Sequence, residues 1–351
     1  MSAKPLFESP SVSESLLERK SARTQSQPRD SDGGIGEGAR LSQNSDDSRS
    51  SDTQSHVPSA SADTASPLAE EVALAAGFRV GVAEDRNKRY RRTMEDAHTF
   101  IYKYGGINGQ GFFAIFDGHA GKSAAECQHC FQPHTQTLLK LINDNPNTPI
   151  PQLLNDTFVE TDAQLGAKKG VSSGCTAVVA FVRVEQRAIE GETLAVKRRV
   201  LYTANVGDAR AVLSRSGKAL RLSYDHKGSD PHETQRIMEC GGFVVNGRVN
   251  GVLAVTRALG DASMKDYIVG NPYTTETVLT DADNILVLAC DGVWDVCTDQ
   301  DAIDYIFETS ERSSTPQVAA EELLNHSLEK FSTDNLSVMV VRFADLSTLP
   351  L

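Results

Sequence analysis

The sequence predicts an α+β fold in which antiparallel β-sheets pack against α-helices. Short apolar runs rich in Val, Ile and Phe are typical of buried strands, and here they occur in clusters. Helical segments do not alternate one by one with these strands, which disfavours a doubly wound parallel sheet. Residues 200–204 and 209–213 flank the turn-forming stretch 205–208, so this region predicts an antiparallel hairpin.

The individual elements follow from local hydrophobic periodicity. Strands are expected at 112–116, 176–182, 200–204, 209–213, 252–255, 285–290 and 336–343. Helices are expected near 68–76, 122–141, 151–165, 231–240, 300–309 and 316–330. In the last of these, Val318, Leu323, Leu324 and Leu328 fall on one face, and Pro316 stands early, where a helix tolerates proline.

Composition and charge restrict the class of protein. The 351 residues are 39% hydrophobic and 23% charged, as in soluble globular proteins, and the formal net charge is −12. This charge disfavours nonspecific binding to nucleic acid or to an anionic membrane, and no apolar stretch approaches the ~20 residues of a membrane span. Six scattered cysteines fit a reducing compartment, and residues 1–8 do not resemble a signal peptide, so we expect the protein in the cytoplasm and nucleus.

The chain divides into a polar tail, residues 1–70, and a folded part, residues 71–347. The tail is rich in Ser, Asp and Arg, and its only aromatic residue is Phe7. Such a segment buries too little apolar surface to offset the conformational entropy lost on ordering, so we expect it to be disordered. Two interpretations stay open: a passive tail, or a regulatory tail phosphorylated at Ser9 or Ser66, each of which precedes a proline.

Carboxylates at the ends of apolar runs are the main indication of function. One expected strand leads into Asp117, another leads into Asp291, and Asp334 precedes a third. An unpaired carboxylate at the end of a buried strand is costly because the charge loses its hydration. Several such ends are explained if they converge on cations, and Mg²⁺ and Mn²⁺ prefer carboxylate, carbonyl and water oxygens. The sequence therefore predicts a metal-dependent hydrolase.

Other polar residues allow more than one interpretation. Arg91 precedes the carboxylate pair at 95–96 and suits a phosphate group, because a guanidinium donates two parallel hydrogen bonds, although mixed charge is also typical of a solvated face. His119 either exchanges protons near neutral pH or is a structural histidine. Asp208 lies in the expected hairpin turn, and Asp261 is either a metal ligand or the partner of a nearby arginine.

A series of short motifs runs through the folded part of the chain. The motifs are Arg-x-x-x-Glu-Asp at 91–96, Asp-Gly-His-Ala-Gly at 117–121, Ser-Gly-x-Thr-Ala at 173–177, Gly-Asp-x-Arg at 207–210, Arg-Val-Asn-Gly at 248–251, Arg-Ala-Leu-Gly-Asp at 257–261, Asp-Gly-x-Trp-Asp at 291–295 and Asp-Asn at 334–335. Taken in order, they resemble those of the metal-dependent protein phosphatases of type 2C (the PPM family). The resemblance covers about residues 78–343, and every family motif is present. Residues 89–96 and 201–208 are similar in particular to fungal members that act on stress-activated MAP kinase cascades.

The resemblance implies a fold and a set of metal ligands. The fold is a four-layer αββα sandwich of two central antiparallel β-sheets flanked by helices. The ligands implied for two Mg²⁺ or Mn²⁺ ions, which Asp117 would bridge, are Glu95, Asp117, Gly118 (through its carbonyl), Asp291 and Asp334. The ligands implied for a weaker third ion are Asp208, Asp291 and Asp295.

The resemblance also implies an activity. The protein would be a protein serine/threonine phosphatase in which a water activated by two metal ions hydrolyses phosphoserine and phosphothreonine. Arg91 would bind the phosphate, His119 would act as general acid, and Arg248 would belong to a variable flap at about 225–250 beside the site. Its partners would be phosphorylated proteins, including MAP kinase pathway kinases that it regulates negatively, and it would be a monomer without nucleic-acid or membrane partners. Two alternatives stay open: a kinase-binding protein without catalysis, and a two-metal phosphohydrolase for small molecules.

Overall fold

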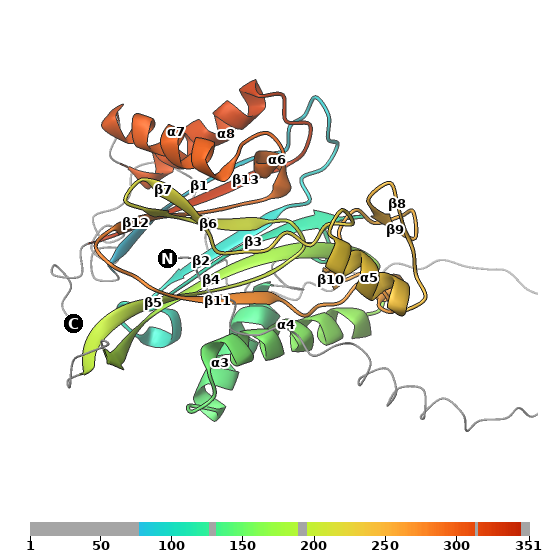
Figure 1. Cartoon of the computed structure of the whole chain (residues 1–351), viewed down its shortest axis with the longest axis horizontal. Coiled ribbons are helices and arrows are strands. Elements are labelled where there is room, and N and C mark those ends of the chain that lie inside the picture. Colours follow the sequence, from blue (N-terminus) through green and yellow to red (C-terminus); the bar gives the residue numbers. More distant parts are fainter. Residues whose placement is uncertain (1–76, 126–130, 189–194, 313–314, 345–351) are drawn as a thin grey trace, which may run out of the picture. The chain divides into compact units, whose positions relative to one another are not determined.

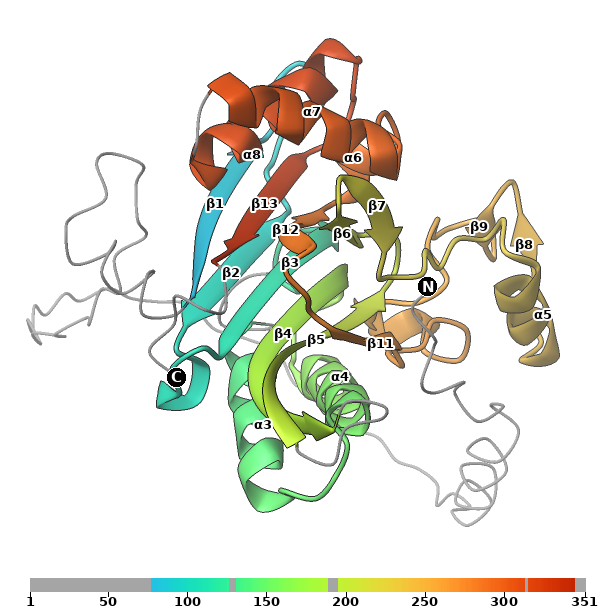
Figure 2. The ribbon, with the colours of Figure 1, turned by 60° about the vertical axis from the view of Figure 1, so that its left-hand side comes forward.

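The computed structural model describes residues 77–125, 131–188, 195–312 and 315–344. These residues form two antiparallel β-sheets that lie between two layers of helices (Figures 1 and 2). The predicted tail, residues 1–70, and the expected helix at 68–76 fall outside the described residues. Within the described segments, no helix is both long and apolar enough to cross a membrane.

The first sheet has the strand order β11-β5-β4-β3-β2, and its neighbouring strands are antiparallel. Its strands are β2 (Ala97–Tyr102), β3 (Gly111–His119), β4 (Gly174–Ala188), β5 (Ala195–Val206) and β11 (Tyr273–Val278), with the short β10 (Leu259–Gly260) paired to β4. Helices α3 (Phe131–Asp144) and α4 (Ile150–Ala167) cover the outer face of this sheet (Figure 1).

The second sheet has the order β1-β13-β12-β6-β7 and is also antiparallel. Its strands are β1 (Phe78–Asp85), β6 (Arg210–Arg215), β7 (Lys218–Arg221), β12 (Asp283–Ala289) and β13 (Leu336–Phe343). Helices α7 (Asp299–Arg312) and α8 (Pro316–Glu329) cover its outer face, and the one-turn helix α6 (Asp291–Trp294) follows β12. A Cβ atom on Gly81 of β1 would overlap the backbone of Pro316 and Gln317, so α8 can pack this closely only on glycine.

Alternating side chains of the central strands supply three apolar layers. In β3, Phe112 and Phe116 pack under α3 and α4, whereas Phe113 and Ile115 face the second sheet. Strand β12 alternates in the same way between the other sheet and the α7–α8 layer. Because both faces of these strands are buried, their sequences are continuous apolar runs. The α+β class and the four-layer sandwich are confirmed.

The predicted hairpin between residues 200–204 and 209–213 is wrong. Strand β5 pairs with β4 and β11 in the first sheet, whereas β6 pairs with β7 and β12 in the second. Residues 207–209 therefore carry the chain from one sheet to the other, and Gly207 takes the positive φ of 82° that this crossing requires. As a result, Asp208 lies between the two sheets and not in a surface turn.

The connection from β7 to β11 forms a small unit with its own apolar centre. It contains α5 (Pro231–Glu239) and the hairpin of β8 (Val244–Val245) and β9 (Arg248–Val249), and thus the predicted flap region 225–250. Its buried apolar side chains are Ile237, Val249, Val255, Ala258 and Ile268. The strand expected at 252–255 is wrong, since these residues form turns and isolated bridges and Val252 is 64% exposed.

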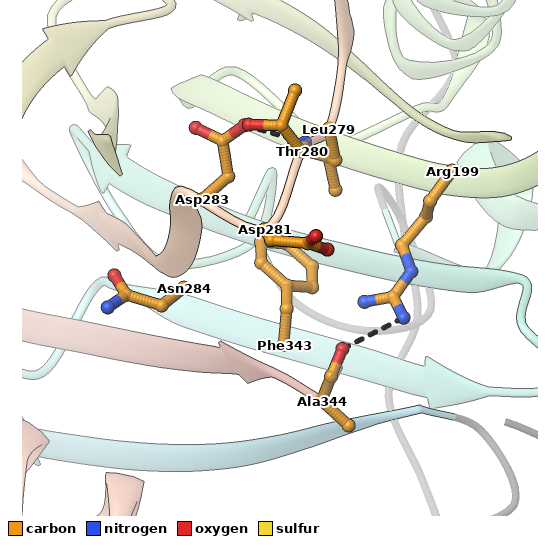
Figure 3. Close-up of a pocket in the computed structure, with 8 residues that line it drawn as sticks. All are labelled: Arg199, Leu279, Thr280, Asp281, Asp283, Asn284, Phe343 and Ala344. Carbon is orange, nitrogen blue, oxygen red and sulfur yellow. Dashed lines mark hydrogen bonds between the residues drawn. The ribbon is translucent and has the colours of Figure 1, made fainter. Parts of the chain in front are cut away.

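A buried arginine connects the two ends of the described domain. The guanidinium of Arg199 donates to the carbonyl oxygens of Gly77 at 3.2 Å and Ala344 at 3.1 Å, and it lies over the ring of Phe343. Arg199, Phe343 and Ala344 border a cavity of about 130 Å³, which Figure 3 shows. The cavity contains none of the predicted site residues.

Candidate metal centre and active site

Three carboxylates from different elements meet at one edge of the sandwich. Asp117 lies in β3, Asp208 lies in the crossing from β5 to β6, and Asp291 is the first residue of α6. One oxygen from each carboxylate lies within 4.8 Å of the others. Asp117 stands near the end of β3 in the first sheet, Asp291 follows β12 of the second sheet, and Asp208 stands in the crossing that joins the two sheets, so the three carboxylates come together where the sheets are connected.

The carboxylates in this cluster repel one another electrostatically. Burial raises the pKa of Asp117 well above its usual value, and the charges of Asp96 and Asp291 add to the rise. Burial and the charge of Asp208 likewise raise the pKa of Asp291. Burial also raises the pKa of Asp96 to about 6, although its carboxylate accepts a hydrogen bond from Ser337 Oγ at 2.8 Å. Buried carboxylates with too few counter-charges favour the binding of cations.

Two further observations show that the cluster suits a hard divalent cation. Oδ1 of Asp208 is buried and has no hydrogen-bond partner among the described residues. A Cβ atom on Gly118 would overlap the carbonyl oxygen of Glu95, so only glycine allows the backbone at 118 to approach this segment. Carboxylate and carbonyl oxygens are the donors that Mg²⁺ and Mn²⁺ prefer. The donor set therefore fits the predicted metals.

Asp334 and Arg91 form an ion pair at the outer side of the cluster. Nη2 of Arg91 donates to Asp334 Oδ2 at 2.5 Å, and Nε of Arg91 donates to the carbonyl oxygen of Thr333 at 3.2 Å. The Arg91 side chain is nevertheless half exposed, so part of its guanidinium can accept an anion from solvent. Glu95 lies nearby, where its carboxylate accepts from the backbone N–H of Gly121 at 3.1 Å.

Lys227 joins two of the carboxylates predicted for a third ion. Its Nζ lies 3.4 Å from Asp208 Oδ2 and 3.1 Å from Asp295 Oδ1. Partial burial alone would lower the pKa of Lys227, but the charges of Asp208 and Asp295 outweigh it and the pKa is raised. The ammonium group therefore supplies positive charge where the sequence predicts a metal.

His119 is paired with Asp261, the last residue of the predicted Arg-Ala-Leu-Gly-Asp motif. Its Nε2 lies 2.7 Å from Asp261 Oδ2, and Asp261 is buried. Asp261 has a positive φ of 49°, and the residue before it, Gly260, donates its N–H to Asp162 Oδ1 at 2.8 Å. Helix α4 thus positions the turn that holds the carboxylate against the imidazole.

Arg248 lies apart from the carboxylate cluster. It is exposed in β9, and its Nη1 donates to the carbonyl oxygen of Val252, in the turn that follows β9, at 2.8 Å. The helix α5 beside this hairpin is fixed by Glu233, which pairs with Arg257 at 2.6 Å and with Arg236 at 3.0 Å.

Three residues of the site were not assigned by the sequence. No motif singles out Lys227, which the structure places beside Asp295. The sequence allows Asp261 as a metal ligand or an arginine partner, whereas the structure pairs it with His119. Asp96 was noted only as part of a motif, although its carboxylate lies among the charges of the cluster. Its position beside Glu95 was the available indication.

The sequence profile of the protein phosphatase 2C family matches residues 80–336. The chain belongs to this family. Two relatives, each named Protein phosphatase 2C homolog 1, are 44% identical to it. The match to the Schizosaccharomyces pombe protein spans 269 residues and covers 76% of this chain and 74% of the relative. The match to the Saccharomyces cerevisiae protein spans 268 residues and covers 75% of this chain and 93% of the relative. The protein is a metal-dependent protein serine/threonine phosphatase, and phosphoproteins are its substrates.

Solved structures share the fold of the phosphatase. A Caenorhabditis elegans sex-determining protein superposes with a TM-score of 0.66 at 25% identity, covering 76% of this chain and 65% of that chain. A Toxoplasma gondii phosphatase superposes with a TM-score of 0.63 at 25% identity, covering 76% and 95%.

Proposed function

We propose that the phosphatase hydrolyses phosphoserine and phosphothreonine with two Mg²⁺ or Mn²⁺ ions and a weaker third ion. The ligands of the two ions would be Glu95, Asp117, the carbonyl of Gly118, Asp291 and Asp334, and those of the third would be Asp208, Asp291 and Asp295. The observation that carries this proposal is the convergence of Asp117, Asp208 and Asp291 within 4.8 Å with too few counter-charges. When bound, the ions supply positive charge for the phosphate and lower the pKa of the attacking water.

The residues of the chain then bind the substrate and move a proton. Arg91 holds the phosphate through those guanidinium N–H groups that face solvent. His119 donates a proton to the oxygen of the departing serine or threonine, which is otherwise a poor leaving group; general acids contribute roughly 10²–10⁴-fold. Asp261 fixes the orientation of the imidazole and is a positioning residue. Arg248, exposed on the hairpin near α5, would contact the protein part of the substrate.

We propose further that the substrates include kinases of stress-activated MAP kinase cascades, which the phosphatase would regulate negatively. Support comes from the similarity of residues 89–96 and 201–208 to fungal members with this role. The phosphatase would act as a monomer in the cytoplasm and nucleus.

The decisive experiment is phosphate release from a phosphothreonine peptide with Mn²⁺, Mg²⁺ or EDTA, together with calorimetric titration of each cation. We expect turnover that EDTA stops and okadaic acid does not, and cation binding that Asp117→Asn weakens. The control is Asp281→Asn, which changes an exposed carboxylate at the remote cavity and should alter neither result. A folded protein that binds cations but releases no phosphate would favour a kinase-binding protein without catalysis.

A further inference from the structure

An aromatic residue occupies the turn after α8 at a position that favours glycine. The N–H of Phe331 donates to the carbonyl of Leu328 at 3.0 Å, and the N–H of Ser332 donates to that of Ser327 at 3.1 Å. This pair of bonds defines a Schellman motif, whose residue after the C-cap has a left-handed conformation and is usually glycine. Phe331 takes this conformation with a φ of 64°.

Phe331 gains no burial in return for this conformation. Its side chain is 77% exposed, the largest exposed fraction among the large hydrophobic side chains of the described residues. A left-handed conformation disfavours a residue with a Cβ atom, and an exposed ring adds no packing. A single exposed aromatic residue is common, but one held in a left-handed conformation without packing suggests a role outside the fold.

The turn that carries Phe331 lies against the loop that carries Arg91. Nδ2 of Asn87 donates to the carbonyl of Ser332 at 2.7 Å, and Nε of Arg91 donates to that of Thr333 at 3.2 Å. The carbonyl of Asn87 also accepts from the N–H of Tyr90 at 2.9 Å. Tyr90 is 45% exposed, so two exposed aromatic side chains flank the residue that we propose as the phosphate ligand.

The same loop is strongly basic. Lys88, Arg89 and Arg92 are all exposed, and none of them forms an ion pair within the described parts of the chain. Arg89 instead lies over the ring of Tyr90, with its guanidinium carbon 5.4 Å from the ring centroid. On a protein of net charge −12, this loop is a local positive surface that attracts acidic groups.

We propose that a rim surface formed by Lys88, Arg89, Tyr90, Arg92 and Phe331 binds the segment of a phosphoprotein substrate beside the phosphorylated residue. This rests on the proposed function, because it takes Arg91 as the phosphate ligand. Tyr90 and Arg92 are the chain neighbours of Arg91, and Phe331 lies two residues before Thr333, which Arg91 contacts. An extended chain spans about 3.3–3.6 Å per residue, so substrate residues within two or three positions of the phosphate lie within roughly 7–11 Å of it, on the scale of this surface. The aromatic side chains favour an apolar substrate residue, and the cations favour an acidic one. The rim thus selects phosphoproteins in which both occur beside the phosphoresidue.

The test compares two phosphothreonine peptides and p-nitrophenyl phosphate, using the full chain with Mn²⁺. One peptide carries Leu and Glu beside the phosphothreonine, and the other carries Ser and Lys at the same positions. Phe331→Gly keeps the turn, because glycine prefers it, and should not lower the melting temperature. We expect this variant and Tyr90→Ala to lower kcat/KM for the Leu/Glu peptide about fivefold to tenfold, the size of one good interface contact, and to change p-nitrophenyl phosphate hydrolysis less than twofold.

Ile107→Ser is the matched control. Ile107 is 56% exposed but precedes β3, at the opposite end of that strand from Asp117. The Ile107→Ser variant should leave the ratio of kcat/KM between the Leu/Glu and Ser/Lys peptides unchanged. An unchanged ratio in Phe331→Gly, or an equal loss on all three substrates, would overturn the rim proposal.

Peptide binding separates this proposal from the proposed function. Fluorescence anisotropy of the labelled peptides in EDTA measures affinity without turnover. A wild-type protein that hydrolyses nothing with Mn²⁺ would refute the proposed function. The rim proposal would still be supported if the wild-type protein bound the Leu/Glu peptide more tightly than the Ser/Lys peptide and Phe331→Gly removed this difference. Equal affinity of the wild-type protein for both peptides would refute it.

Discussion

Replacing Glu233 by glutamine should weaken the unit between β7 and β11. The Glu233 carboxylate is buried in α5 and accepts from Arg257 Nη2 at 2.6 Å and Nε at 3.0 Å. Arg236 Nη2 donates to it at 3.0 Å and Thr256 Oγ1 at 2.9 Å. Glutamine keeps the shape but removes the charge, which leaves two arginines around a neutral side chain.

The pKa of Glu233 gives the magnitude. Burial alone would raise this pKa, but the hydrogen bond and charge of Arg257, with the charge of Arg236, outweigh it and lower the pKa from 4.5 to about 2. A difference of that size is equivalent to about 3 kcal/mol of folding free energy at neutral pH. Because the pKa is lower in the folded state, this stability is present above about pH 4.5 and is lost as the pH falls towards 2. About 1 kcal/mol of it should be lost by pH 3.5.

The assay is urea denaturation of wild type and Glu233→Gln at pH 7 and pH 3.5, with hydrogen exchange over residues 231–270. Exchange is needed because the small apolar centre of this unit can open without global unfolding. Glu239→Gln is the matched control, since Glu239 is an exposed glutamate of the same helix whose partner is Gln235. A loss of less than 1 kcal/mol at pH 7 in both measurements, or a loss that does not shrink at pH 3.5, would show that the ion pairs do not stabilise this unit.

Three other outcomes are expected. Asp291→Asn should abolish metal-dependent phosphate release yet raise the melting temperature in EDTA, since it removes one of several mutually repelling buried charges; substantial activity would contradict the ligand assignment. Asp261→Asn should lower kcat about tenfold to a hundredfold with little change in KM, and more for alkyl than for p-nitrophenyl phosphates, because His119 loses its positioning partner. Deleting residues 1–70 should leave p-nitrophenyl phosphate turnover intact, and a large fall would place the tail within the catalytic unit.

The sequence predicts best the strands that are buried on both faces. Strands β3 and β12 are buried on both faces, so their apolar runs are uninterrupted and visible in the sequence. Strand β11 was missed because threonines fill much of it, and a polar strand lacks that pattern. The apolar run at 252–255 is not a strand. It lies in turns, and it is apolar in part because Val255 packs in the small apolar centre near α5.

Strand pairing was harder to predict than strand position. Residues 205–208 do have the chemistry of a turn, but that chemistry does not determine which strands pair afterwards. Here the pairing of β6 with β12, which lies about 70 residues later in the chain, replaces the local hairpin. This error had a functional consequence, because a hairpin turn would have left Asp208 on the surface.

The carboxylates of the site could be predicted, whereas their protein partners could not. An acidic residue at the end of an apolar run is unusual, so the few residues around Asp117 and Asp291 are enough to single them out as candidate site residues. The pairing of His119 with Asp261 spans 142 positions, and no local pattern indicates which distant carboxylate an imidazole meets.

The basic side chains of the site neutralise its outer carboxylates but not its inner ones. Arg91 pairs with Asp334, and Lys227 pairs with Asp208 and Asp295, so the outer carboxylates have counter-charges from the chain itself. No basic side chain forms an ion pair with Asp117 or Asp291 in the described part of the chain, and their pKa values are raised well above the usual value. In the proposed function, Arg91 therefore has two competing anions, the Asp334 carboxylate and the substrate phosphate. Its guanidinium becomes fully available to phosphate only when Asp334 acquires another counter-charge, so cation binding and phosphate binding should strengthen each other.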